Sequence, residues 1–264
     1  MYSPTFFLLT DFGLSDPYVG QMKAILWSQV PEARILDLSH GVRPHNVLQA
    51  AFFLASSWPY LPSESIGLAV IDPGVGTSRS ILLLRQGEKT VLAPDNGLLG
   101  LLLDSRSDCR MWRIHSSSPE KEISSTFHGR DVFAPLASGL AQGVGPDQLG
   151  TEIEPAKSRG LFWTPPSLQA DRVQAAVVHV DHFGNCVLNL EAELWGGRLQ
   201  TDKPIDLLHP RPQAVYPVST YAQIPDAQAG ILTGSQGYLE LACNQRSCAR
   251  DLDLDIGDQC TLKI

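Results

Sequence analysis

The first 150 residues alternate between short apolar runs and longer segments whose apolar residues have helical spacing. Residues 66–71 form an uninterrupted apolar run, which is typical of a parallel strand buried on both faces. This alternation predicts an α/β domain with a largely parallel sheet between helices. The expected strands are 5–10, 33–38, 66–71, 80–84 and 90–93, and the expected helices are 18–29, 47–57, 97–103 and 131–140.

The pattern changes near Gly150. Residues 156–172 have few periodic apolar positions, so we interpret them as a linker between a domain at 1–155 and a domain at 173–264. Short, closely spaced strand-like runs without a long helix predict that the second domain is a small β-barrel. The expected strands of this barrel are 173–180, 186–190, 205–208, 230–233, 238–243 and 259–264.

Charge and composition disfavour several classes of partner. The 264 residues include 20 Lys and Arg against 28 Asp and Glu, a net charge of −8, so we expect no nucleic-acid partner and no anionic membrane surface. The longest apolar runs have about six residues, whereas a membrane-spanning helix needs roughly 20. The start of the chain does not have the pattern of a secretory signal. Five cysteines without CxxC spacing are expected to be reduced in a cytoplasmic protein, with a Cys243–Cys248 disulfide as the alternative.

Polar residues follow the predicted strands at the point where each strand ends. Asp11, the segment 37–40, Asp72 and Asp95 lie at the ends of four of the five expected strands, and the polar segment 125–131 leads into the last predicted helix. A single Asp at such a position is as often a turn former or helix cap. Ligand sites in open α/β sheets lie beyond the carboxyl ends of the strands, so the repetition predicts a polar pocket there.

Asp72, Arg79 and His128 are the candidate catalytic residues of this pocket. Each has an ordinary structural interpretation, such as a turn or a surface ion pair. If the fold brings them together, a carboxylate and a guanidinium can orient a neutral imidazole and a bound water, an arrangement suited to His128 as a general base. The sequence lacks the phosphate-loop and GxGxxG patterns, which disfavours an ATPase and a dinucleotide-dependent dehydrogenase. It also lacks the spacings typical of metal ligands and the GxSxG elbow, so we expect neither a metal site nor a serine-hydrolase triad.

Two motifs stand out in the second half. Residues 181–185 (DHFGN) are either a plain turn or part of a site, because Gly184 and Asn185 are turn formers. Residues 235–244 carry Ser235 and Asn244, and the structural alternative for this segment is a strand with Glu240 on its solvent face.

Seven strings in this order resemble the S-adenosylmethionine (SAM) hydrolase family, also called the SAM hydroxide adenosyltransferase family, which is related to fluorinase and chlorinase enzymes. The resemblance covers nearly the whole chain, and the seven strings are specific only in combination. They are TDFGLSDPYVGQMK (10–23), DLSHGVRPHNVLQAA (37–51), IDPGVGTSRS (71–80), APDNGLL (93–99), STFHGRDVFAPLA (125–137), VDHFGN (180–185) and GSQGYLELACN (234–244).

The resemblance implies an α/β nucleoside-binding domain followed by a β-barrel, in a homotrimer that binds SAM between the N-terminal domain of one subunit and the C-terminal domain of the next. It implies that water or hydroxide attacks ribose C5′ and releases adenosine and L-methionine. The leaving group is a neutral thioether, so catalysis would rest on positioning and partial desolvation of the nucleophile. No cofactor is expected, because SAM is the substrate.

The resemblance also implies roles for individual residues. Asp72, Arg79 and His128 match the set thought to position or activate water, and Asp11 matches the carboxylate that holds the ribose hydroxyls. The residues that match contacts to the methionine end are Asp181, Asn185 and Ser235. The residues that match the adenine contacts and an apolar wall are Tyr221, Asn244 and Phe183.

Departures from the halogenating relatives favour hydrolysis. Those relatives carry an aromatic residue in place of Asp72 and lack an equivalent of His128, and a carboxylate should repel a halide. His45 replaces a tryptophan of the fluorinase, and Gln236 and Cys243 replace arginines, so the contact to the substrate carboxylate is expected to differ. The alternatives are a SAM-dependent halogenase and a non-catalytic adenosine- or SAM-binding protein.

Overall fold

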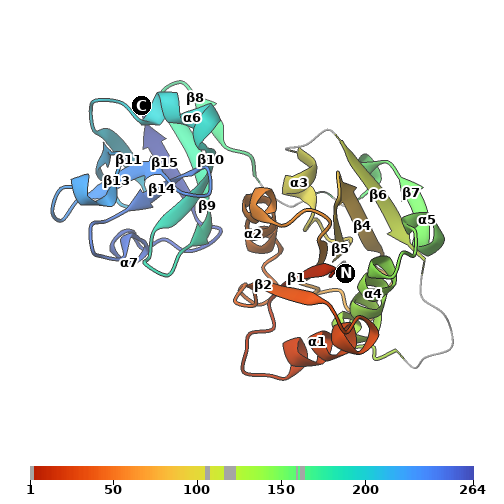
Figure 1. Cartoon of the computed structure of the whole chain (residues 1–264). Helices are drawn as coiled ribbons and strands as arrows, with labels where there is room; N and C mark the ends of the chain where they lie inside the picture. The colour runs from red at the N-terminus through yellow and green to blue at the C-terminus, as the bar shows by residue number, and fades with distance from the viewer. Residues whose placement is uncertain (1–2, 105–107, 116–122, 159, 161–163) are drawn as a thin grey trace. The chain divides into compact units, whose positions relative to one another are not determined.

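The computed structural model describes residues 3–104, 108–115, 123–158, 160 and 164–264. The chain forms two compact units, residues 1–162 and 163–264 (Figure 1). The boundary falls inside the range 156–172 that we expected as a linker, part of which lies outside the described residues.

Unit 1 contains one seven-stranded mixed sheet in the order β2-β1-β3-β5-β4-β6-β7. The first four strands in this order, β2, β1, β3 and β5, are parallel to one another. The other three, β4, β6 and β7, join them through antiparallel pairs. The predicted α/β layer is therefore confirmed, and its parallel part is one side of the sheet. The strands are β1 (Thr5–Thr10), β2 (Arg34–Ser39), β3 (Ile66–Val70), β4 (Ile81–Gln86), β5 (Lys89–Pro94), β6 (Cys109–Ile114) and β7 (Gly150–Ile153).

Helices cover both faces of this sheet, which explains why its central strands are apolar on both sides. Phe6 and Leu8 of β1 pack with residues of α1 and α4, whereas Phe7 and Leu9 pack with residues of α2. Gly67 of β3 leaves room for the Phe7 ring, which a β-carbon at this position would overlap. The helices and short helical turns are α1 (Tyr18–Gln29), α2 (Val47–Ser57), η1 (Trp58–Tyr60), α3 (Gly100–Asp104), η2 (Gly129–Phe133), α4 (Ala134–Ala141), α5 (Pro146–Leu149) and η3 (Pro155–Lys157).

Unit 2 is a closed seven-stranded barrel, as the sequence predicted. Its strand order is β10-β14-β13-β12-β11-β15-β9, and a β10–β9 pair closes the cylinder. Inward-facing residues such as Leu188, Ile231 and Leu241 are fully buried and form its core. The barrel strands are β9 (Arg172–Val180), β10 (Cys186–Glu191), β11 (Ile205–His209), β12 (Gln213–Pro217), β13 (Ala229–Thr233), β14 (Tyr238–Ala242) and β15 (Gln259–Lys263).

Smaller elements complete unit 2. A short strand, β8 (Ser167–Gln169), lies within the range expected as linker and pairs antiparallel with the first residues of β9. The short helices are α6 (Ala192–Leu199), η4 (Tyr221–Gln223) and α7 (Cys248–Leu252). All five cysteines are free thiols, so the alternative Cys243–Cys248 disulfide is absent. In the part of the chain that the structure describes, no helix is both long and apolar enough to cross a membrane.

Candidate active site

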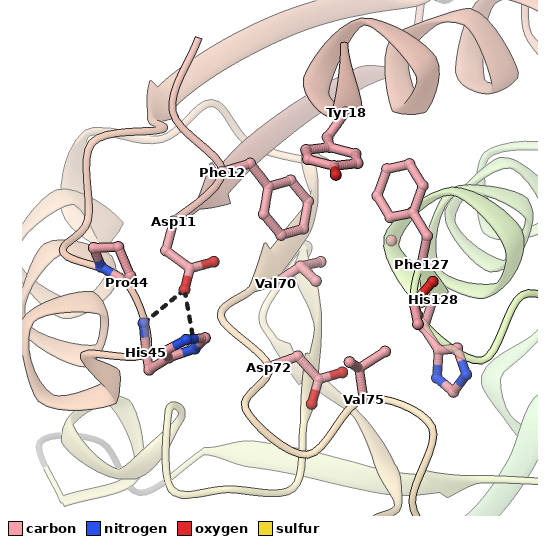
Figure 2. A pocket seen from close by; sticks show the side chains of 12 residues that line it. Asp11, Phe12, Tyr18, Pro44, His45, Val70, Asp72, Val75, Phe127 and His128 are labelled. Carbon is pink, nitrogen blue, oxygen red and sulfur yellow. Dashed lines mark hydrogen bonds and ion pairs between the residues drawn. The ribbon is translucent and has the colours of Figure 1, made fainter. Parts of the chain in front are cut away.

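The carboxyl ends of β1, β2, β3 and β5 meet at one edge of the sheet, because these four strands are parallel. A pocket of about 290 Å³ lies there, close to the lower end of the roughly 300–1,000 Å³ range of small-molecule sites. Figure 2 shows Asp11 and His45 on one side of it and aromatic rings on the other. The pocket is lined by Asp11, Phe12, Tyr18, Pro44, His45, Val70, Asp72, Val75, Thr126, Phe127, His128 and Gly129.

Asp72, Arg79 and His128 are joined by hydrogen bonds. The Arg79 Nε lies 2.9 Å from both carboxylate oxygens of Asp72, and an Arg79 terminal nitrogen also contacts Asp72 Oδ2. The same guanidinium nitrogen lies 2.8 Å from Nδ1 of His128. The side chains of Asp72 and Arg79 are only 5% and 6% exposed, so this ion pair is well shielded from water. The structure thus brings the three candidate catalytic residues together.

Local backbone geometry creates this contact. After β3, the Asp72 carbonyl accepts from the Val75 N–H at 3.2 Å, and the Gly74 carbonyl accepts from the Thr77 N–H at 3.2 Å. Gly76 has a φ of +76°, and a β-carbon there would overlap the Ser125 carbonyl oxygen. The glycine therefore lets the turn after β3 pack against the segment that leads to His128.

The electrostatics of this group favour a neutral His128. Partial burial and the adjacent Arg79 guanidinium lower the pKa of His128 below its ordinary value of 6.5, against the opposing effect of Asp72 and Asp131. A guanidinium can only donate, so Nδ1 of His128 accepts, and the neutral ring then carries its proton on Nε2. His128 therefore offers an N–H donor at Nε2.

Asp11 follows β1, and its carboxylate lies in the pocket. Its side chain is 8% exposed. Oδ2 accepts from the His45 N–H at 2.8 Å (Figure 2), and His45 takes a φ of +66° to present that donor. The remaining acceptor capacity of this carboxylate suits a ligand with hydroxyl donors.

One side of the pocket is an aromatic wall that was not predicted from the sequence. The Tyr18 and Phe127 ring centroids are 5.1 Å apart, and Phe12 packs edge-on at 5.8–5.9 Å from both. Phe12 and Phe127 directly follow and precede the candidate residues Asp11 and His128. That adjacency is the signal by which they could have been found.

The candidate residues of unit 2 lie on a turn and on the outer side of the barrel. Asp181 Oδ1 accepts from the backbone N–H groups of Phe183 at 2.9 Å and Asn185 at 2.8 Å, and Oδ2 accepts from the Asn185 side-chain amide at 2.9 Å. These bonds fix the turn, while Phe183 at its tip is 76% exposed. Asp181 and Asn185 are thus turn-forming residues as well as candidates for ligand contacts.

Glu240 is not on a solvent face, which corrects the structural alternative given for residues 235–244. It is 5% exposed on the outer side of the barrel, and its carboxylate accepts from the Tyr221 hydroxyl. Burial and the negative charge of Asp181 raise the pKa of Glu240, whereas the Tyr221 hydrogen bond lowers it; the net pKa is above the ordinary value. Tyr221 itself is half-exposed, and its hydroxyl is held by the buried Glu240 carboxylate.

The other unit 2 candidates lie in turns. Ser235 and Gln236 are exposed in the turn between β13 and β14. Asn244 is partly buried in a turn that the Cys243–Arg246 bridge closes, and Cys243 is buried. Within the described residues, no group of three or more His, Cys, Asp or Glu side chains is arranged to hold a metal ion.

Both units match one protein family. Residues 6–150 match the SAM hydroxide adenosyltransferase N-terminal domain, and residues 175–261 match its C-terminal domain. The chain is 34% identical over 262 residues to a curated (R)-S-adenosyl-L-methionine hydrolase of Thermus thermophilus, covering 96% of this chain and 97% of that protein. A protein of the same name from Salinispora tropica is also 34% identical, with 97% of each chain covered. A fluorinase of Nocardia brasiliensis is 25% identical over 293 residues, covering 99% of this chain and 97% of that protein.

Solved structures agree with these matches. An uncharacterized conserved protein from Thermotoga maritima has a TM-score of 0.89 at 28% identity, covering 98% of this chain and all of that one. A conserved hypothetical protein from Thermus thermophilus has a TM-score of 0.77 at 32% identity, with 99% of each chain covered. Because both domains and full-length relatives match, the chain belongs to the SAM hydroxide adenosyltransferase family.

Proposed function

We propose that this protein hydrolyses SAM to adenosine and L-methionine by attack of water on ribose C5′. The observation that carries the proposal is the hydrogen-bonded group Asp72–Arg79–His128, which borders the same pocket as the Asp11 carboxylate. The names of the curated relatives support the substrate and the reaction.

The reaction makes modest demands on the protein. A C5′–O bond forms, the C5′–S bond breaks with its electron pair leaving to sulfur, and one proton from the water is released. Methionine departs as a neutral thioether, so no acid is needed to protonate it and no metal or organic cofactor is needed to activate it. We therefore propose a cofactor-free enzyme whose main task is to hold the nucleophile in line with the leaving group.

The pocket geometry gives each residue a role in this reaction. Asp11 accepts hydrogen bonds from the ribose hydroxyls, and the wall of Phe12, Tyr18 and Phe127 reduces the hydration of the nucleophile. His128 donates from Nε2–H to the oxygen of the attacking water or hydroxide. This differs from the base role considered for His128 in the sequence analysis, because Arg79 occupies its Nδ1 lone pair.

Unit 2 supplies the contacts to the remainder of the substrate in this proposal. Asp181 and Asn185 contact the methionine ammonium end, and Ser235 contacts the carboxylate. On the adenine side, Tyr221 provides an aromatic face whose hydroxyl is anchored on Glu240. The residues proposed for the adenine edge and for an apolar wall are Asn244 and Phe183.

We further propose a homotrimer in which unit 1 of one subunit and unit 2 of the next complete each site, as the family resemblance implies. Five free thiols, four of them buried, support a cytoplasmic location, where thiols stay reduced. Adenosine and SAM are the small-molecule partners in this proposal.

Incubation of the purified protein with SAM in halide-free, ¹⁸O-labelled water tests the reaction. We expect adenosine labelled at its 5′ oxygen and unlabelled methionine, detected by liquid chromatography and mass spectrometry. Intact SAM together with protein-bound adenosine would instead support the non-catalytic binding protein.

The same assay with added chloride or fluoride tests the halogenase alternative that the fluorinase relative raises. We expect no 5′-halo-5′-deoxyadenosine, because Asp72 neutralises the Arg79 guanidinium and the pair leaves no uncompensated positive charge to bind a halide. A halogenated nucleoside as the main product would overturn hydrolysis as the function.

The curated relatives are named for the R configuration at sulfur, so we propose the R epimer of SAM as the preferred substrate. Separate incubations with each purified epimer test this. Faster turnover of the S epimer would contradict the assignment without affecting the chemistry at C5′.

A further inference from the structure

We propose that His40 is a positioning residue for the ribose end of the pocket: it fixes residues 10–13 and thereby the direction of the Asp11 carboxylate. The proposal rests on the proposed function only for the identity of the group that Asp11 binds. His40 follows β2, outside the lining of the pocket, and its side chain is 3% exposed.

His40 lies in a chain of polar contacts that runs from the surface to Thr10. Lys23 Nζ lies 2.6 Å from Asp37 Oδ2, and Asp37 Oδ1 lies 3.0 Å from His40 Nε2. On the other side of the ring, Nδ1 lies 2.8 Å from the hydroxyl of Thr10, a fully buried residue. The imidazole thus links the carboxyl end of β2 to the carboxyl end of β1.

The direction of these hydrogen bonds follows from Asp37. Burial raises the pKa of Asp37, but the hydrogen bonds from Lys23 and His40 outweigh it and leave the pKa below its ordinary value. An ionised carboxylate only accepts, so Nε2 of His40 carries a proton. In the neutral ring, Nδ1 then accepts from the Thr10 hydroxyl, whose oxygen in turn accepts from the Phe12 N–H at 3.3 Å.

A second contact holds the same loop from its other end. The His40 carbonyl accepts from the Gly13 N–H at 2.8 Å, and Gly13 has a φ of +65°. Residues 10 and 13 are therefore both tied to His40, with Asp11 between them. Within the part of the chain that the structure describes, both contacts of the Asp11 carboxylate, to the His45 N–H and to the His45 ring, are made by Oδ2. The fixed loop leaves Oδ1 to meet a ligand hydroxyl.

Two amide variants separate the two sides of the His40 ring. In His40→Asn the amide occupies the position of Nδ1 and keeps a partner for Thr10, whereas in His40→Gln the amide reaches the position of Nε2 and keeps only the partner for Asp37. If the Thr10 contact positions Asp11, the Asn variant stays close to the wild type and the Gln variant does not. Thr10→Ser and Thr10→Val form a second pair, in which only Ser keeps the hydroxyl.

The readout is the affinity of the full-length protein for adenosine and for 2′,3′-dideoxyadenosine, measured by calorimetry. We expect His40→Gln and Thr10→Val to lose about tenfold or more in affinity for adenosine, the scale of a hydrogen bond to a charged group. Their affinity for the dideoxynucleoside should stay unchanged, because that ligand has no hydroxyls for Asp11. Thermal unfolding of each variant verifies that it is folded.

Equal losses for both nucleosides, or no loss for either, would show that His40 only supports the fold and would overturn the proposal. Asp11→Asn separates this failure from failure of the proposed function. If Asp11→Asn weakens only adenosine while His40→Gln does not, the positioning role alone is wrong. If Asp11→Asn leaves the adenosine preference intact, or the wild type does not bind adenosine, the ribose assignment and the positioning role both fail.

Discussion

Among single residues, His128 is the one whose substitution should slow turnover without weakening substrate binding. Its Nδ1 is occupied by Arg79, so only Nε2–H faces the reaction in the proposed mechanism. We expect His128→Ala to bind SAM with little change in affinity and to lose about 10²–10³-fold in kcat, as when one oriented donor to a reacting oxygen is removed. His128→Gln, whose amide can donate, should retain more activity than His128→Ala. Single-turnover rates and calorimetry check both variants, and unchanged turnover in His128→Ala would remove this residue from the mechanism.

The protonation state of His128 predicts the pH dependence. Burial and Arg79 lower its pKa below 6.5, so the ring stays neutral to lower pH than a free imidazole. Protonation of the ring would place an N–H at Nδ1 against the Arg79 donor and break the hydrogen bond between Arg79 and His128. We therefore expect kcat/KM to fall with decreasing pH through an apparent pKa below 6.5 and to be flat above it. A profile recorded over about pH 5 to 9 checks this, and the acidic limb should disappear in His128→Gln.

Residue types at strand ends were sufficient to predict the pocket, because parallel strands bring their carboxyl ends together. The contact between Arg79 and His128, 49 positions apart, could not be predicted in this way, since it depends on the Gly76 turn packing against Ser125. The burial of Glu240 was harder still to predict from the sequence. Strand alternation places it opposite the barrel core, and its contact with Tyr221 joins positions that are 19 residues apart.

Among the loops, the turn after β3 is the element that assembles the catalytic group. In Gly76→Ala the new β-carbon meets the Ser125 carbonyl, and the positive φ adds about 1–2 kcal/mol of strain. We expect a lower Tm together with a large loss of kcat, because both Asp72 and His128 would shift. Gly87 in the β4–β5 hairpin is the matched control, with a φ of +55° and open space around its β-carbon position. Gly87→Ala should lower Tm slightly and leave kcat unchanged. If Gly76→Ala and Gly87→Ala changed kcat equally, the result would contradict the role of the turn after β3.

Two of the strands that were not predicted, β6 and β12, have sequences that interrupt the usual strand pattern. β6 contains Arg110 and Arg113, which interrupt its apolar pattern, and Arg110 is accommodated by an ion pair with Glu152 on β7 and by the Trp112 ring. β12 ends in a proline, and it lies between β11, its antiparallel partner, and β13, its parallel partner. The pairing of β6 with β4 and β7 joins segments that are distant in sequence, which local periodicity does not contain.

At the scale of the whole molecule, the two units carry complementary halves of the proposed site. Unit 1 has the triad and the Asp11 carboxylate, and unit 2 has the Asp181 turn and the Tyr221–Glu240 pair. Neither set includes proposed contacts for every part of SAM. The proposed trimer therefore assigns each site to unit 1 of one subunit and unit 2 of the next. In a head-to-tail ring, each subunit contributes its two different surfaces to two different sites.

Mixed trimers test that arrangement. His128→Ala disables unit 1, and Asp181→Asn disables unit 2 while keeping the oxygen that accepts from two backbone N–H groups. If each site combines unit 1 of one subunit with unit 2 of the next, random mixing of the two variants by co-expression restores about a quarter of the wild-type activity, since half of the unit 1 surfaces and half of the unit 2 surfaces are intact. If each site lies within one subunit, every site carries one defect and no activity returns. Activity of the co-expressed protein, with sedimentation to verify the trimer, decides between the two arrangements.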